Sequence, residues 1–398
     1  MNTWRKSSPT GRVLLLAVLF TGLTTFMFLP LLALQLTEQG IGAGRAGFLV
    51  GLLAFCGQGF SLICGLIVDR FGTRVVLSAG FALRIAGYLL LGHGLAAGTH
   101  PAALVGGIVG IGVGGSLLGL SVKTLLVRED GLPAREMLAL RSTFVNIGVI
   151  VGPALGALIY PLGFGYVLAA CVASHLVLGL RLTLRPPAAA PGPPPASGKG
   201  EQDSADGRAA WARWQWAPLA LLGVAFWAIY SQLNVVLPIA AKDLTGSASA
   251  ISVVFTLNGT LVVLFQYSLL RHVFGKAGTR SLLALGFLAF GGGYALLIAF
   301  SGWGALLVFV LPITLAEMLI APSLDEQAIH ASSLRRTGLA LGTMSAAGAL
   351  GSFLGSGLGG YLLQTMHGGT GLWLLISCLS VAAAAFCFLL PKGSPQHV

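Results

Sequence analysis

The sequence predicts an all-α membrane protein with twelve transmembrane helices, arranged as two parallel six-helix repeats. Three observations lead to this prediction: the scarcity of charge, the number of uncharged segments, and short motifs that occur twice. Only 9% of the 398 residues are charged while 56% are hydrophobic, and the mean hydropathy is +0.88. Soluble domains carry about 25% charged residues, so the composition excludes a soluble fold.

The number of spans follows from the segments that lack Asp, Glu, Lys and Arg. A helix needs about 20 residues to cross the hydrocarbon core, and several of these segments are long enough for two helices. Turn-forming residues divide them, as at 99–101 and 367–369. A β-barrel does not fit, because barrel strands alternate in short runs. The twelve expected spans are 12–36, 46–68, 75–94, 101–124, 137–160, 164–182, 216–239, 247–270, 279–300, 303–323, 338–362 and 369–391.

The first span and the cysteines suggest no processing or metal chemistry. The apolar run of the first span is too long for a signal peptide, and no clear cleavage site follows it. The five cysteines all fall inside spans without metal-ligand spacing, so we expect them to be packing residues. No cluster of His, Asp, Glu or Cys supports catalysis. We therefore expect no enzyme activity, no cofactor and no metal.

The net charge of +11 is explained by membrane topology. If the N-terminus is cytoplasmic, 20 of the 23 basic residues fall on the cytoplasmic side, and every loop obeys the positive-inside rule. Of the other three, Arg45 and Lys242 fall outside and Arg84 lies within the third span. We expect both termini in the cytoplasm, a bacterial inner membrane location, and no nucleic-acid partner.

The chain divides into two related halves. Residues 183–215 are rich in proline and glycine, as in a flexible cytoplasmic linker, and separate residues 1–182 from 216–398. Pro30 and Pro238 begin the same Pro-x5-Leu-Thr pattern at an offset of 208. Six spans per half give both halves the same orientation, which is a parallel repeat.

Two further motifs recur in the same order. The Gly-Thr-Arg of residues 72–74 returns at 278–280, an offset of 206. A series of glycines four residues apart occurs in the fifth span and in the eleventh, at an offset of 203. The glycines are Gly148, Gly152 and Gly156 in the first half and Gly351, Gly355 and Gly359 in the second.

The loop after the second span reads GLIVDRFGTR at residues 65–74. It resembles the signature loop of the major facilitator superfamily, G-x-x-x-D-R-x-G-x-R, and the six-plus-six layout extends this resemblance to the whole chain. The resemblance implies the major facilitator fold and transport by rocking of the two halves. The second copy, at 271–280, keeps its basic residues but has no acid.

The chemistry of this loop suggests a conformational latch. Gly65 allows close helix approach, and Gly72 permits a tight turn. Asp69 is a carboxylate at the membrane boundary, where it needs a partner. The resemblance implies that this partner is the start of the eleventh span near Thr337, a contact broken and remade during transport. The expected latch residues are Gly65, Asp69, Arg70, Gly72 and Arg74.

The fifth span carries GVIVGPALG at residues 148–156. It resembles the antiporter motif of drug–proton exporters of the same superfamily. Gly148, Gly152 and Gly156 share one helix face and permit close packing, while Pro153 removes a backbone hydrogen bond and bends the helix. We expect this face to pack against the eighth span and seal one side of a cavity. Generic packing of small residues is the alternative.

Ionisable residues at membrane depth are functional candidates, because burying their charge is costly. The arginine motif that the superfamily commonly has in span 4 is absent, as is its acid in span 1. Glu317 in span 10 is the first candidate for proton coupling, followed by Arg84 in span 3 and His175 in span 6. Each could instead be a structural residue, paired or packed within the helix bundle.

Uncharged polar residues within the spans suggest a substrate cavity. With the aromatic residues Phe226 and Trp227 nearby, such a cavity suits an amphipathic ligand. The expected cavity residues are Asn146, Tyr230, Gln232, Asn234 and Asn258.

Export of an amphipathic small molecule by proton antiport is the function that these features favour. The substrate would be a drug or a secreted metabolite such as a siderophore, and the protein would act as a monomer. The absence of an ATP site points to an ion gradient as the energy source. Two alternatives remain, uptake of a nutrient by proton symport and a membrane scaffold that transports nothing.

Overall fold

The computed structural model describes residues 7–127, 134–184, 208–275, 277–330, 337–366 and 369–389, and all their regular elements are helical. The α-helices are α2 Pro9–Glu38, α3 Ala43–Gln58, α4 Ser61–Phe71, α5 Thr73–Ala96, α6 Pro101–Val127, α7 Ala134–Ile159, α8 Phe164–Leu184, α9 Arg208–Tyr230, α10 Val236–Thr245, α11 Ala250–Ser268, α12 Thr279–Ala299, α13 Gly302–His330, α14 Thr337–Thr365 and α15 Gly369–Phe386. Short helical turns are η1 Tyr160–Leu162, η2 Ser231–Leu233, η3 Leu269–Val273 and η4 Cys387–Leu389.

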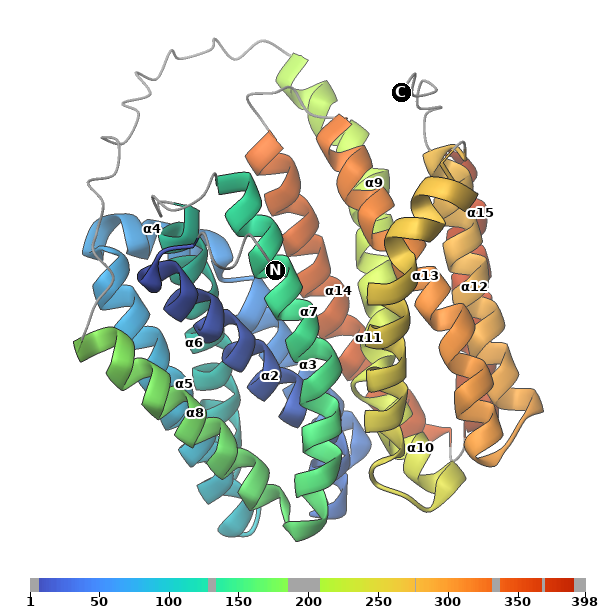
Figure 1. Ribbon diagram of the computed structural model, residues 1–398. Coiled ribbons are helices and arrows are strands. Elements are labelled where there is room, and N and C mark those ends of the chain that lie inside the picture. The colour runs from blue at the N-terminus through green and yellow to red at the C-terminus, as the bar shows by residue number, and fades with distance from the viewer. Residues whose placement is uncertain are drawn as a thin grey trace.

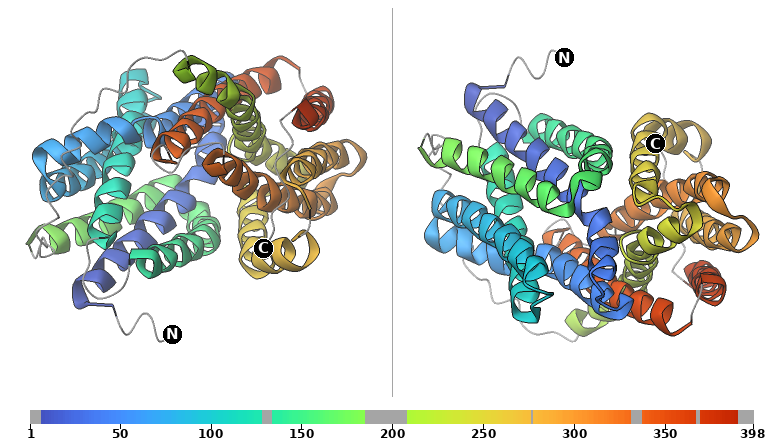
Figure 2. Two further views of the ribbon diagram at one scale, coloured as in Figure 1. Left: turned by 90° about the horizontal axis from the view of Figure 1, so that it is seen from above. Right: turned by 90° about the horizontal axis from the view of Figure 1, so that it is seen from below.

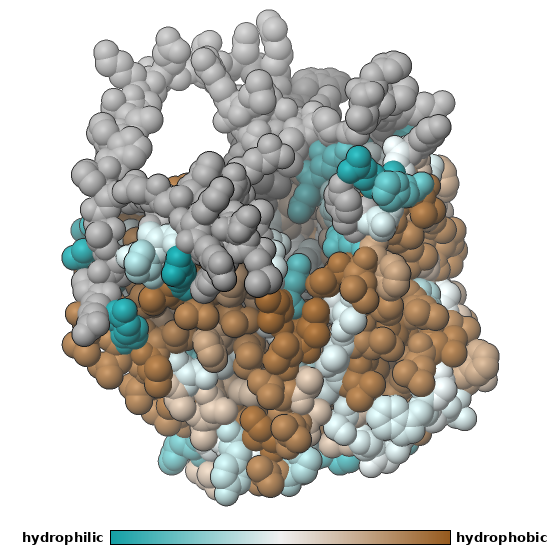
Figure 3. Space-filling model, in the orientation of Figure 1, coloured by the Kyte–Doolittle hydropathy of each residue, from teal (hydrophilic) through white to brown (hydrophobic). Residues whose placement is uncertain are grey.

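These helices confirm the predicted membrane fold. Ten segments of the described chain are long and apolar enough to cross a bilayer, and two shorter apolar helices, Ala43–Gln58 and Ala250–Gln266, occupy the expected positions of spans 2 and 8. The side of the molecule seen in Figure 3 carries a broad hydrophobic band, with hydrophilic residues gathered beyond it. Exposed leucines such as Leu66 and Leu158 fit contact with lipid.

Two of the expected spans are broken rather than continuous. Span 2 is divided at Gly59 and Phe60 between α3 and α4, where glycine lowers helix propensity. Span 7 is divided between α9 and α10 by the 3-10 turn η2. Ser231 and Gln232 both donate side-chain hydrogen bonds to the Ala228 carbonyl there, which competes with the regular helix ladder. Proline at 238 also lacks the amide that would have bonded the carbonyl of residue 234.

The helices lie in two groups, α2 to α8 and α9 to α15 (Figure 1). Views from above and below show the groups side by side (Figure 2). Across their boundary α3 packs against α14 and α7 packs against α11. Residues 185–207 of the expected linker lie outside the described residues. The remainder of 183–215 is helical, since α8 continues to Leu184 and α9 begins at Arg208.

The recurring glycines make equivalent contacts in the two groups. A Cβ atom added to Gly152 would lie 2.7 Å from the Leu23 carbonyl oxygen, so the glycine face of α7 packs directly on the backbone of α2. In the second group Gly355 faces Ala228, which places α14 on α9 in the same way. The first and fifth spans of each half therefore share one glycine-mediated contact.

The expectation that the glycines of α7 face span 8 is wrong. Gly148, Gly152 and Gly156 all lie against α2. It is the adjacent face of α7 that meets span 8, where Ile150 and Val149 contact Gly259 of α11. The reason is that glycines four residues apart form a groove for one helix backbone, and α2 fills it.

The turn between α4 and α5 depends on Gly72, as predicted. Its φ of 81° lies in the left-handed region that other residues avoid, and its amide donates to the Val68 carbonyl to end α4. Arg70 and Arg74 are exposed beside it. Gly65 lies within α4, but its surroundings, the Asp69 side chain and the side chains at the start of α14 are outside what the structure describes, so the latch stays a prediction.

Candidate functional site: a central cavity between the two helix groups

A cavity of about 520 Å³ lies between the two groups of helices. Its walls come from α2, α3, α5, α6 and α7 on one side, and from α9, α11, α13 and α14 on the other. A site bounded by both groups changes shape whenever the groups move relative to each other. This position suits a substrate site that alternately opens to the two sides of a membrane.

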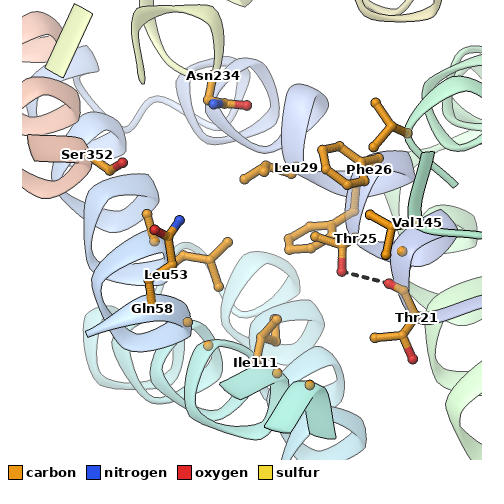
Figure 4. Close-up of a pocket in the computed structure, with 18 of the residues that line it drawn as sticks. Thr21, Thr25, Phe26, Leu29, Leu53, Gln58, Ile111, Val145, Asn234 and Ser352 are labelled. Atoms are coloured by element: carbon orange, nitrogen blue, oxygen red, sulfur yellow. Dashed lines mark hydrogen bonds between the residues drawn. The ribbon is translucent and has the colours of Figure 1, made fainter. Parts of the chain in front are cut away.

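Most of the cavity wall is apolar. Figure 4 shows Phe26 and Leu29 of α2 facing Leu53 of α3, with Ile111 of α6 below them. Trp227 adds an aromatic side chain from the second group. Such a wall stabilises the hydrophobic part of a ligand, while a few polar groups orient it.

Glu317 of α13 lines this cavity and is held by neutral groups. Its Oε1 accepts a hydrogen bond from the Tyr230 hydroxyl at 3.2 Å, and its Oε2 accepts one from the Asn258 amide at 3.0 Å. Asn258 also donates to Thr314 at 3.1 Å. Within the described part of the chain, no Lys, Arg or His lies within 4.0 Å of this carboxylate. A half-buried carboxyl at membrane depth without a counter-charge is suited to gaining and losing a proton.

Arg84 of α5 also reaches the cavity, although the third span is at the edge of the bundle. Its Nη2 donates to the Thr25 hydroxyl and to the Tyr88 hydroxyl, each at 2.8 Å. The residue is only 3% exposed. Glycines of α6 make this reach possible, because Gly114 and Gly115 leave room for the side chain to pass.

His175 does not line the cavity. It is fully buried behind Arg84, where its ring packs between Phe81 and Tyr88 with centroid separations of 6.1 and 5.5 Å. Its Nδ1 lies 2.8 Å from the Cys171 carbonyl oxygen. The structure therefore supports the packing alternative for His175, and does not place it in a path for protons.

The five expected cavity residues divide into three groups. Tyr230 and Asn234 line the cavity. Asn258 lies behind it and binds Glu317. Gln232 and Asn146 are not among the lining residues. Gln232 is instead buried between α9 and α14, where its amide donates to the Gly355 carbonyl at 2.8 Å, because the break at η2 turns it away from the cavity.

Several cavity residues were not predicted from the sequence. Thr21 and Thr25 of α2 lie four residues apart and face the cavity, with the Thr25 hydroxyl donating to the Thr21 carbonyl at 2.8 Å (Figure 4). Gln58 and Ser352 also line the wall, as does Arg141. The i, i+4 spacing of the two threonines is the sequence pattern that could have identified them as cavity residues. Arg141 was interpreted only as a basic residue that sets the topology.

One end of the cavity is closed by contacts between the two groups. Lys242 of α10 forms an ion pair with Glu38 at the end of α2, and Tyr160 donates to the same carboxylate at 2.6 Å. Near them the Gly44 amide donates to Gln364 at 3.1 Å, joining α3 to α14. At its other end the cavity extends to Arg141, close to where α7 begins.

Comparisons with known proteins agree with this architecture. The family model described as Major Facilitator Superfamily matches residues 14–240 and 219–398. The chain is 28% identical to the multidrug resistance protein MdtH of Aeromonas hydrophila over 264 residues, which is 62% of this chain and 60% of that relative. It is 24% identical to the uncharacterized MFS-type transporter YqjV of Bacillus subtilis over 98% of this chain and 96% of that relative. The chain thus spans less than two thirds of the length of the Aeromonas hydrophila MdtH.

Solved structures with the same fold include peptide transporters. An auto-inhibited POT family peptide transporter superposes with a TM-score of 0.79 over 98% of this chain and 99% of that chain, at 12% identity. A POT family transporter in complex with a thioalcohol-conjugated peptide gives a TM-score of 0.78 over 97% and 98%, at 14% identity. At such low identity the likeness shows the fold alone.

Proposed function

The chain belongs to the Major Facilitator Superfamily and is a multi-pass membrane transporter rather than an enzyme, and from this premise we propose that it exports an amphipathic small molecule in exchange for protons. The membrane is the inner membrane of a bacterium, with both termini in the cytoplasm. The substrate is a drug or a secreted metabolite such as a siderophore. The protein acts as a monomer.

The observation that carries the proposal is the position of Glu317. The carboxyl lines the same cavity as the apolar wall, and only Tyr230 and Asn258 hold it. A substrate entering this cavity displaces water around the carboxyl and changes its affinity for a proton. Competition between substrate and proton for one cavity is the simplest basis of exchange. The two other coupling candidates, Arg84 and His175, offer no such titrating group facing the cavity.

Two features support export over uptake. The α7 motif resembles that of drug–proton exporters, and its glycines and Pro153 lie on a helix that contacts both α2 and α11. The cavity extends toward the end where α7 begins, which the distribution of positive charge predicts to be cytoplasmic. A substrate would then enter from the cytoplasm. MdtH, a relative of this chain, is named a multidrug resistance protein.

The test uses everted membrane vesicles that contain the full chain and carry an imposed pH gradient. Dissipation of the gradient is recorded while amphipathic compounds and secreted metabolites are added. We expect active compounds to release protons from the wild-type vesicles, and Glu317→Gln to abolish this response while compound binding persists. Asp243→Asn is the matched control, because it removes an exposed carboxylate of α10 distant from the cavity. Unchanged proton release by Glu317→Gln would assign coupling to another residue.

Uptake by proton symport is the competing function. Symport predicts accumulation of substrate in right-side-out vesicles with protons moving inward in the same direction. Export predicts accumulation in everted vesicles instead. Comparison of a deletion strain with its parent, against a panel of toxins and by analysis of secreted metabolites, separates a drug exporter from a dedicated metabolite exporter.

A further inference from the structure

The charges that line the central cavity are unevenly distributed between the two helix groups. Among its described lining residues the first group supplies two arginines, Arg84 and Arg141, and no acid. The second group supplies one acid, Glu317, and no base. Within the described part of the chain the carboxyl of Glu317 is bound by a hydroxyl and an amide and forms no ion pair with either arginine.

The passage of Arg84 into the cavity depends on the glycine-rich α6. A Cβ atom at Gly114 would lie 2.7 Å from Cγ of Arg84, so any larger residue would obstruct the aliphatic stem. A Cβ atom at Gly115 would lie 3.8 Å from Nη1, beside the guanidinium group. Because Gly114 and Gly115 of α6 have no side chains, Arg84 of α5 can extend past α6 into the central cavity.

The guanidinium group of Arg84 is only partly bound. Both of its hydrogen bonds come from Nη2, to Thr25 and Tyr88, and both acceptors are neutral hydroxyls. Its Nε is buried without a hydrogen-bond partner, and its Nη1 donates to no acceptor in the described part of the chain. A charge buried at membrane depth is costly unless an opposite charge compensates it. The missing counter-charge points to a ligand.

We propose that the transported molecule is an amphipathic anion, whose carboxylate, phosphate or sulfonate group binds Arg84 and whose apolar body lies against Phe26, Leu29 and Trp227. This inference rests on the proposed function only in taking the cavity as the transport site. Arginine suits the role because its planar group can donate two parallel hydrogen bonds to an acidic group. The ring of Tyr88, whose centroid lies 5.6 Å from Cζ of Arg84, packs against the guanidinium group.

Arg141 extends the positive region along the path of entry. It lines the cavity near the start of α7, and its Nε has no hydrogen-bond partner. An anion is attracted first to Arg141 and then to Arg84, whereas a cation meets these two like charges against the single carboxyl of Glu317. We therefore expect the cavity to bind amphipathic anions more tightly than amphipathic cations.

The test measures equilibrium binding to the full chain in lipid nanodiscs, without a gradient. Three probes share one ring system and differ in charge: 2-naphthoate, its methyl ester, and a naphthyl trimethylammonium ion. We expect the wild-type protein to bind the anion at least about tenfold more tightly than either other probe, as hydrogen bonds to a charged group imply. Arg84→Gln is expected to remove this preference and to leave the affinity for the ester within a factor of about two.

Matched variants keep the experiment decisive. Arg84→Lys retains charge without the planar fork, so it is expected to recover part of the anion preference. If Arg84→Gln fails to fold, Arg141→Gln removes the other positive charge of the cavity at a less buried position. It is expected to weaken the preference for the anion. Arg45→Gln removes an exposed arginine of α3 as the control and is expected to bind like wild type.

Equal affinities for the three probes, tighter binding of the cation, or binding of none of them would overturn the inference. So would an equal loss of ester and anion binding in Arg84→Gln. Because no gradient is present, the result does not depend on proton coupling or on the direction of transport. A failure of Glu317→Gln to affect proton release would leave the anion preference intact, so the two proposals can fail separately.

Discussion

At the scale of single residues, the surroundings of each buried ionisable group decide what it can do. Glu317 and Arg84 both line the cavity. The carboxyl of Glu317 accepts hydrogen bonds from neutral groups only. The guanidinium group of Arg84 donates to neutral hydroxyls through one nitrogen only. His175 is fully buried, has aromatic rings on both sides and contacts the backbone of its own helix. All three residues were predicted as coupling candidates because they lie at membrane depth, and only two of them line the cavity.

We expect His175→Phe to transport and couple protons like the wild-type protein. The phenyl ring can occupy the space between Phe81 and Tyr88, and the histidine has no access to the cavity from which a proton could be exchanged. Proton release from everted vesicles checks this expectation at several pH values. A pH profile that differs from wild type, at equal protein abundance, would return His175 to the coupling path.

At the scale of helices, the glycine series explains how the fold repeats itself. Gly152 on α7 contacts the backbone of α2, and Gly355 on α14 contacts that of α9. The sequence predicted the repeat from three short motifs. The prediction that the α7 glycines face span 8 was wrong, because they pack against α2. Spacing along a helix identifies a smooth face, but several neighbouring helices can fill it, and only packing shows which one does.

A pair of substitutions on α14 tests this packing. We expect Gly355→Ala to destabilise the protein by about 1–3 kcal/mol, the usual cost of overpacking, because the added methyl group would lie 2.5 Å from Cα of Ala228. Gly357→Ala, two residues further along, is expected to be neutral, since nothing lies within 4 Å of its added Cβ. Thermal unfolding of the two variants in detergent measures the difference. Equal melting temperatures would contradict the close contact of α14 with α9.

At the scale of the whole molecule, one end of the cavity is closed by contacts that must separate during transport. The Glu38–Lys242 ion pair joins α2 to α10, and the Gly44–Gln364 hydrogen bond joins α3 to α14. The cavity extends the other way, toward the start of α7. Transport therefore requires the contacts at this end to separate.

A disulfide across the closed end should stop transport. A Cβ atom at Gly44 would lie 3.7 Å from Cβ of Tyr361, within the range of about 3.5–4.5 Å found in disulfides. We expect the double variant Gly44→Cys with Tyr361→Cys to lose transport when oxidised and to regain it after reduction. Each single variant is the control for the native cysteines. Full transport by the cross-linked protein would show that this end does not open.

The sequence by itself determined that lipid surrounds this protein, how many helices cross the membrane, and that the halves are related by repetition. These properties follow from local composition and spacing, because each span must satisfy its own backbone hydrogen bonds and bury its own apolar surface in lipid. The sequence also named Glu317, Tyr230 and Asn234, which line the cavity. Charge is so scarce that few candidates existed.

Only the tertiary structure decided which polar groups meet in that cavity. Gln232 and Asn234 are two residues apart, yet one binds α14 and the other lines the cavity, because η2 interrupts the helix between them. Arg84 comes from a span at the edge of the bundle and arrives through the glycines of α6. Rotation of a helix about its axis, breaks within it and gaps in its neighbours are properties of packing, and no single segment of sequence contains them.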